Sequence, residues 1–148
     1  MTDDWRAHLL DTPAQLDALL ADLRRVAVLG IKPETHADQP AHYVPAYVQS
    51  LGVEVVPVPV YYPEVSRILG VPVQRRLEDV ARPVDIVDVF RRGEDVTQHL
   101  DAMLALRPRC VWMQSGIRNA AVAEALARAG IDVVQDRCLL VELRRRRG

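Results

Sequence analysis

The chain has 148 residues, the length of one typical domain, and its 19 Lys and Arg residues nearly balance 20 Asp and Glu residues, for a formal net charge of -1. This balance gives no general electrostatic reason to expect a nucleic acid or an acidic membrane surface as partner. The amino terminus lacks the pattern of a signal peptide, and no apolar stretch approaches the ~20 residues that span a bilayer. We therefore expect a single cytoplasmic domain over residues 1–148.

The two cysteines, Cys110 and Cys138, are too few for a disulfide framework and belong to no CxxC or His/Cys pattern. We expect both to be reduced, and we expect no metal site. A protein partner or a homo-oligomer stays open at this stage.

The amino-terminal segment, residues 1–24, is predicted to contain a helix. Asp11 or Thr12 can cap it, Pro13 suits its first position, and leucines follow at helical spacing. At the other end of the chain, the basic tail over residues 144–148 is expected to be solvated and frayed.

Between these ends, strand and helix patterns alternate. Further helices are predicted to begin at Pro40, after Gly93 and at Asn119, and the interrupted region 65–80 suggests only a short helix near its end. Five apolar segments rich in β-branched residues are predicted as buried parallel strands: 26–29, 54–58, 84–90, 110–113 and 131–134.

This alternation predicts a three-layer, Rossmann-like, doubly wound α/β fold with about five parallel strands. Numbering the strands along the chain, we expect the order 3-2-1-4-5. In such sheets the ligand lies beyond the carboxyl ends of the strands where the direction of winding reverses, and this order puts the reversal between the first and fourth strands.

Basic residues follow the carboxyl ends of four predicted strands, which suggests an anionic ligand. Guanidinium and ammonium groups donate charge-assisted hydrogen bonds to phosphate, and the start of the helix at Pro40 would add a partial positive charge. The alternative is that part of the set points into water or pairs with acidic residues. The set consists of Lys32, Arg91, Arg92, Arg118 and Arg137.

Neither common nucleotide motif is present in the first loop. Gly30 is the loop's one glycine, so GxGxxG is absent, and Lys32 stands outside a Walker A sequence. The second strand ends in Pro57-Val58-Pro59-Val60, with no acidic residue where nicotinamide-binding folds hold the ribose. Ordinary NAD binding is therefore disfavoured.

Few side chains suggest catalysis, and we predict no catalytic residue. Asp88 in the third strand is either a structural carboxylate that holds backbone N–H groups or an arginine, or a base. Cys138, beside Arg137, is either a thiolate or a small buried hydrophobe. His42 is either a phosphate contact or an ordinary helix-surface histidine, and Ser115 lacks the GxSxG context of a nucleophile.

Several segments together resemble the small, stand-alone CoA-binding domain proteins of bacteria and archaea, over about residues 20–143. They are VAVLG at 26–30, PAHYV at 40–44, PVDIVDVFR at 83–91, VWMQSGI at 111–117 and DRC at 136–138. The resemblance implies a Rossmann-like domain similar to the CoA-binding domain of the succinyl-CoA synthetase α subunit. The phosphorylated histidine of that synthetase belongs to a second domain, so ligase activity is not implied.

The resemblance also implies which parts of this chain meet coenzyme A. The first loop would receive the phosphates, the end of the second strand would lie beside the adenosine, and the third and fourth strand ends would line and close the site. In that order the residues are Gly30, Ile31 and Lys32; Pro57, Val58 and Pro59; Val89, Phe90 and Arg91; and Gln114 and Gly116. Relatives usually read Pro-Val-Asn-Pro at the second strand, so Pro59 removes an asparagine that could contact the ribose.

The favoured hypothesis is a module that binds coenzyme A or an acyl-CoA, without catalytic machinery. One alternative is a small NAD(P)-dependent oxidoreductase or another nucleotide-using enzyme. The other is a partner-binding protein whose pocket is vestigial.

Overall fold

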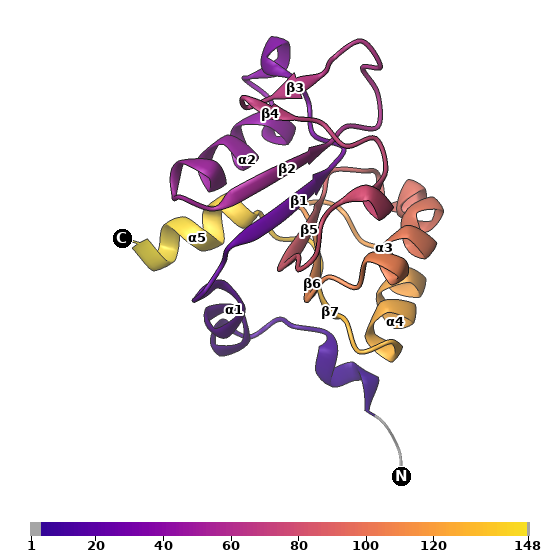
Figure 1. Ribbon diagram of the computed structural model, residues 1–148. Coiled ribbons are helices and arrows are strands. Elements are labelled where there is room, and N and C mark those ends of the chain that lie inside the picture. The colour runs from indigo at the N-terminus through magenta and orange to yellow at the C-terminus, as the bar shows by residue number, and fades with distance from the viewer. Residues whose placement is uncertain (1–3, 148) are drawn as a thin grey trace.

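The computed structural model describes residues 4–147, so residues 1–3 and 148, at the ends of the expected amino-terminal segment and basic tail, lie outside the described residues. Five parallel strands form a central sheet with helices on both sides (Figure 1). The strands are β1 (Arg25–Leu29), β2 (Glu54–Val58), β5 (Ile86–Val89), β6 (Cys110–Met113) and β7 (Asp132–Val134). The α-helices are α1 (Pro13–Leu20), α2 (Pro40–Ser50), α3 (Leu100–Leu106), α4 (Ala120–Arg128) and α5 (Leu139–Arg147).

Shorter elements connect these. They are the 3-10 helices η1 (Trp5–His8), η2 (Glu34–His36), η3 (Leu77–Asp79) and η4 (Gly93–His99), and a hairpin of β3 (Arg67–Ile68) and β4 (Val71–Pro72). The predicted α/β Rossmann-like fold is confirmed. None of the helices in residues 4–147 has the length and hydrophobicity that crossing a membrane requires.

The order of the strands differs from the prediction. The sheet runs β2-β1-β5-β6-β7, which is 2-1-3-4-5 when the five strands are numbered along the chain, so the expected order 3-2-1-4-5 is wrong. Both orders satisfy right-handed crossovers and buried strands, and the apolar pattern does not say on which side of β1 the third strand pairs. The winding therefore reverses between β1 and β5, not between β1 and β6.

Two apolar cores lie on opposite faces of the sheet, because side chains of a strand alternate between its faces. On β1, Val26 and Val28 pack in the core with α1, α2 and α5, whereas Ala27 and Leu29 pack in the core with α3 and α4. Figure 1 shows these two helix layers on either side of the strands. The double coverage explains the continuous apolar runs in the sequence.

The amino-terminal helix begins where the sequence predicts. Thr12 Oγ1 accepts a hydrogen bond from Gln15 N at 3.2 Å, and Gln15 Oε1 accepts one from Thr12 N at 3.0 Å, so the two residues form a capping box. Thr12 rather than Asp11 is the cap. Just before this helix, Leu10 N donates to Val133 O at 2.8 Å and extends the sheet beyond β7.

The basic residues 144–147 do not form the frayed tail that we expect from the sequence. They are the end of α5, and Leu143 beside them is buried against the sheet. Arg146 contacts Glu142 at 3.2 Å and reaches Asp17 of α1 at 2.6 Å. One of these two partners, Asp17, is more than a hundred residues away in the chain, so the local sequence could not reveal it.

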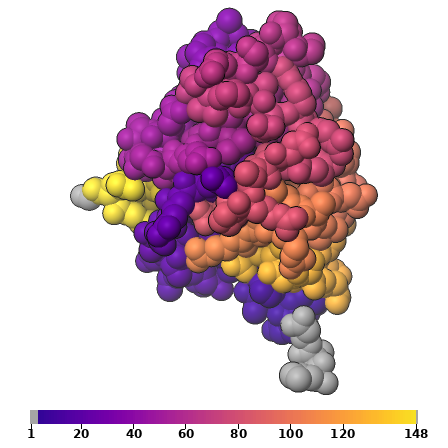
Figure 2. Space-filling view, in the orientation of Figure 1, coloured from indigo at the N-terminus to yellow at the C-terminus, as the bar shows by residue number. Residues whose placement is uncertain are grey.

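The long connection from β2 to β5 covers the upper part of the face seen in Figure 2, where it is coloured magenta to rose. It contains the β3–β4 hairpin, which the sequence did not predict, and η3, which matches the short helix expected there. Gln74 N donates to Pro57 O at 2.9 Å and ties the connection back to the end of β2.

Asp88 lies in the middle of the sheet, between Val28 of β1 and Trp112 of β6. It is fully buried, and neither carboxylate oxygen has a hydrogen-bond partner among the described residues. Of the two alternatives for Asp88, the structure contradicts the anchoring carboxylate, because no N–H group or arginine in residues 4–147 bonds to it. Burial without a partner raises the pKa of Asp88 well above its ordinary value, because the charged form loses its hydration.

The pH dependence of stability should reveal this raised pKa of Asp88. Its pKa is higher in the folded than in the unfolded chain, so its contribution to stability is complete below about pH 3.9 and is lost as the pH rises toward the folded pKa. Asp88→Asn cannot ionise and escapes this loss. We expect the free energy of unfolding of the variant, relative to that of the wild type, to rise by up to about 1.4 kcal/mol per pH unit across that window.

Urea unfolding at about pH 5 and about pH 8 measures the difference. The exposed Asp101→Asn on α3 is the control and should follow the wild type at both pH values. A gap between Asp88→Asn and wild type that stays constant with pH would contradict the raised pKa.

Candidate functional site

Three adjoining hollows lie along the carboxyl edge of the sheet. The wide hollow, about 530 Å³, lies beyond β2 toward η3 and η4. The loop hollow, about 410 Å³, lies between the loop after β1, the start of α2 and the ends of β5 and β6. A connecting hollow of about 60 Å³ shares Tyr61 with the first, and Lys32 and Arg91 with the second. The three follow one another across the reversal between β1 and β5.

Gly30 allows the chain to turn at the start of this edge. Its φ is +86°, and a Cβ atom there would stand 2.4 Å from the carbonyl oxygen of Phe90. Gly30 N donates to Val58 O and Phe90 N donates to Leu29 O, both at 2.9 Å. The first loop is therefore clamped between the ends of β2 and β5, and only glycine fits.

The start of α2 meets the loop hollow through Pro40 and Ala41. Gln39 precedes the helix but its side chain makes no capping bond, because its amide oxygen accepts from the Lys32 ammonium group. Buried His42 donates from Nδ1 to Lys32 O at 2.9 Å, so it holds the loop and is not a surface residue, and it lines none of the three hollows. The helix terminus and Lys32 together make this wall positive.

Arg91 stands where the hollows meet. Its Nε donates to His99 Nε2 at 3.3 Å, and one terminal nitrogen donates to the Tyr61 hydroxyl at 3.2 Å. Burial and the nearby Arg91 charge lower the pKa of His99, in keeping with an Nε2 that accepts a hydrogen bond. Arg91 pairs with no carboxylate among the described residues.

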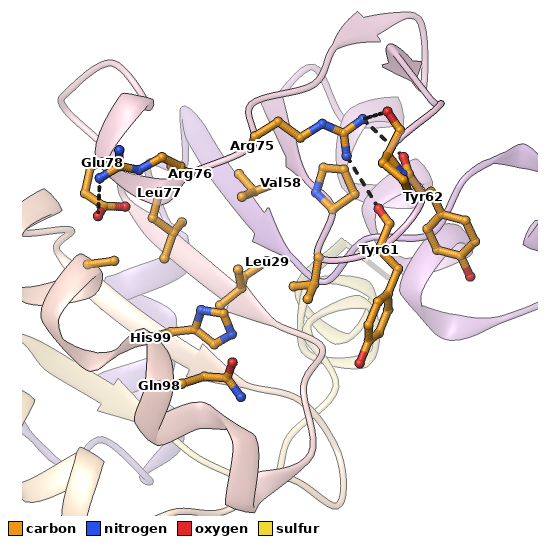
Figure 3. Close-up of a pocket in the computed structure, with 14 residues that line it drawn as sticks. Leu29, Val58, Tyr61, Tyr62, Arg75, Arg76, Leu77, Glu78, Gln98 and His99 are labelled. Carbon is orange, nitrogen blue, oxygen red and sulfur yellow. Dashed lines mark hydrogen bonds and ion pairs between the residues drawn. The ribbon is translucent and has the colours of Figure 1, made fainter.

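The wide hollow has an apolar floor and a polar rim. Figure 3 shows Leu29 and Val58 in the middle of it, with Leu77 and His99 on one side and Tyr61 on the other. The rim also holds Arg76 and Glu78, which form an ion pair at 3.0 Å. A flat apolar group with polar substituents suits such a cavity.

The five basic residues of the predicted anionic site separate into two groups. Lys32, Arg91 and Arg92 line the loop hollow. Arg118 lines none of the hollows and pairs with Asp136 at 3.4 Å, and Arg137 lies on the α1–α5 side, where it contacts Asp11 at 2.7 Å. Arg92 also pairs with acidic residues of η4. Only Lys32 and Arg91 of the five line a hollow without a carboxylate partner in residues 4–147.

The structure brings most of the residues expected to meet the ligand to the same edge. Those that line the hollows are Gly30, Ile31, Lys32, Val58, Pro59, Phe90, Arg91 and Gly116. The side chain of Ile31 is nevertheless buried in the core at 1% exposure, which leaves its backbone as the part near the hollow.

Three of the expected residues lie beneath the edge. Pro57 and Val89 are buried and line none of the hollows. Gln114 is 4% exposed, and its Oε1 accepts from Leu139 N at 3.1 Å, at the start of α5. Its side chain is thus occupied in joining β6 to that helix.

Neither cysteine lies in the hollows. Both are free thiols, and burial raises the pKa of Cys110, which leaves it a protonated core residue. Cys138 is partly buried against the core of α1, α2 and α5. Residues 4–147 contain no group of three or more His, Cys, Asp or Glu side chains that could hold a metal ion.

The sequence did not identify most of the residues that line the wide hollow, among them His99 and Arg75. His99 lies within a helical pattern and Arg75 within the region that showed no clear pattern, so no local signal distinguishes them.

The fold and the edge site define a Rossmann-like α/β domain with a glycine turn and a helix amino terminus at its reversal of winding. The profile of the CoA binding domain matches residues 24–144, most of the chain. The chain therefore belongs to the CoA-binding domain family.

Relatives share this small single-domain form. The "Uncharacterized protein YneT" of Bacillus subtilis (strain 168) is 30% identical over 128 residues, which cover 86% of this chain and 91% of that protein. The structure of cell-free ID.343 from Thermus thermophilus is 42% identical, with a TM-score of 0.83, covering 91% of this chain and 98% of that one. A hypothetical protein from Pyrococcus horikoshii OT3 shares the fold, at 23% identity and a TM-score of 0.82, over 93% and 94% of the two chains.

Two glycine substitutions should distinguish the cost of backbone strain from the cost of a steric clash with Phe90 at this edge. Gly116 also has a positive φ, +81°, but a Cβ atom there meets open space. We expect Gly116→Ala to cost about 1–2 kcal/mol of unfolding free energy from the left-handed conformation alone. Gly30→Ala should cost about 1–3 kcal/mol more, because Phe90 must move. Denaturant unfolding of both variants checks this, and equal losses would contradict the clamp.

Proposed function

We propose that this chain binds coenzyme A or an acyl-CoA along the carboxyl edge of its sheet, as a binding module without catalytic machinery of its own. The principal support is membership of the CoA-binding domain family together with Lys32 and Arg91, two cations at the hollows that pair with no carboxylate in residues 4–147. A buried or half-buried cation without a counterion favours an anionic ligand.

In this proposal the diphosphate lies at the loop hollow. The amino terminus of α2 contributes oriented N–H groups and a partial positive charge, and Lys32 adds a full charge beside it. Arg91 is the second residue after β5 and can contact the same phosphates with a planar guanidinium group. The glycine turn at Gly30 keeps the backbone close enough for the ligand to approach.

The two ends of the cofactor then extend in opposite directions. The adenosine occupies the wide hollow, whose floor of Val58 and Leu77 is apolar and whose rim is polar. The pantetheine passes Phe90 toward Gly116 and Ile117 at the far side of the loop hollow. No nucleophile paired with a base lines this route, which supports a binding role.

One observation favours a second candidate, a dinucleotide such as NAD or NADP. Glu78 reaches the rim of the wide hollow from η3. A carboxylate there could accept hydrogen bonds from the ribose hydroxyls, for which the end of β2 supplies no acidic residue. Its ion pair with Arg76 competes with this role.

Isothermal titration with coenzyme A, acetyl-CoA, NAD and NADP in one buffer distinguishes these candidates. We expect coenzyme A to bind with a micromolar Kd, about -8 kcal/mol, and the dinucleotides to bind much more weakly. Binding of NAD or NADP alone would favour the enzyme class. No heat from any of the four would overturn the proposal and favour a partner-binding protein with a vestigial pocket.

Removal of the unpaired cations should weaken coenzyme A binding. Each of Lys32→Ala and Arg91→Ala removes charge-assisted hydrogen bonds to phosphate, which are worth about 1.5–3 kcal/mol each, so we expect Kd to rise about tenfold to a hundredfold. Arg118→Ala is the control, because Arg118 follows the neighbouring strand but pairs with Asp136 away from the hollows. Unchanged affinity in both test variants would rule out this phosphate position.

A further inference from the structure

The loop over residues 61–65, which walls the wide hollow, is held by a single guanidinium group, that of Arg75. Arg75 donates to the backbone carbonyl oxygens of Tyr61 at 3.5 Å, Tyr62 at 3.1 Å and Pro63 at 3.3 Å, and also to that of Val65. Figure 3 shows this side chain reaching across to the backbone of the tyrosines. Arg75 forms no ion pair within the described chain.

This loop needs such support because its own backbone does not favour the conformation. Tyr62 has a φ of +63°, which a residue with a Cβ atom adopts at a cost of about 1–2 kcal/mol. The Tyr62 ring turns away and packs on His36, with ring centroids 5.4 Å apart. The backbone of Gln74, next to Arg75, is hydrogen-bonded to the end of β2, so the backbone that carries Arg75 is fixed to the sheet.

The consequence is the placement of the Tyr61 ring. Its side chain is 64% exposed, although it lines both the wide and the connecting hollow. It has the Arg91 guanidinium group over it, 5.5 Å from the ring centroid. A large aromatic ring left this exposed beside a cavity, in a strained loop fixed by four hydrogen bonds, offers a flat apolar surface to a ligand.

We propose that Arg75 is a positioning residue that fixes Tyr61 as a stacking surface for the purine ring of the ligand. This proposal rests on the proposed function, and it assigns the nucleotide end of coenzyme A to the side of the wide hollow that Tyr61 forms. Arg75 also lines the wide hollow, but in this proposal it acts through the loop, because its guanidinium group is occupied by the four carbonyl oxygens. A lysine could not replace it, because one ammonium group cannot serve four carbonyl oxygens spread along a turn.

The test uses the full chain and isothermal titration with three probes: coenzyme A, 3′-dephospho-CoA and 4′-phosphopantetheine. For Arg75→Ala and Arg75→Lys we expect about a tenfold weaker affinity for the first two, the order of one base stacked on an aromatic ring, and unchanged affinity for the third, which lacks the purine. Arg67→Ala is the control, because Arg67 also donates to a backbone carbonyl, that of Gly70, but lines none of the hollows.

A mutant cycle with Tyr61 distinguishes positioning from direct contact. Tyr61→Ala should weaken coenzyme A binding as much as Arg75→Ala does, Tyr61→Phe should retain the affinity, and the double variant should lose no more than either single variant. Additive losses would show that Arg75 acts independently of Tyr61 and would overturn the proposal. A loss confined to coenzyme A and absent with 3′-dephospho-CoA would show that Arg75 contacts the 3′-phosphate, and would overturn it as well.

The two proposals fail in different ways. If the wild type binds none of the probes, the proposed function is wrong, and so is the proposed stacking of the purine on Tyr61. If the wild type binds coenzyme A and the Arg75 variants bind it equally well, only the positioning role is overturned. Because Tyr61 is exposed, its variants keep the test decisive even where an Arg75 variant fails to fold.

Discussion

The close approach of Gly30 to the carbonyl group of Phe90 is the constraint on which the site depends. At this point β1 ends between β2 and β5, and hydrogen bonds from Gly30 and to Leu29 hold the first loop to both neighbours. The clamp sends the chain toward Lys32 and the start of α2 on one side, and it puts Arg91 immediately beside them. Every element of the proposed site is positioned relative to this junction.

The charges of the molecule are arranged so that a chain with a net charge of -1 can still offer a positive edge. Arg118 and Arg137 are neutralised by acidic partners that the fold brings to them. Lys32 and Arg91 instead contact uncharged groups, the amide of Gln39 and the hydroxyl of Tyr61. Because local charge and not net charge determines the potential in a cleft, an anionic ligand is compatible with this balanced composition.

Sequence and structure agree where a property is local. Thr12 and the residues after it contain a complete capping box, and the helix begins there. The run 26–29 is apolar throughout because both faces of β1 are covered, and the glycine that follows marks the turn. Much of the candidate site was predictable for the same reason: residues that directly follow parallel strands must meet at one edge of the sheet.

The sequence by itself determined the class of fold, most of the helices and strands, and the set of loops from which the site is built, because periodicity, caps and turn residues act over a few neighbours. Only the tertiary structure decided the strand order, which basic residues lack a partner, the anchoring of residues 144–147 and the support of the Tyr61 loop by Arg75. Each of these depends on contacts between residues far apart in the chain. The sequence around a side chain does not indicate which distant residue folding will bring next to it.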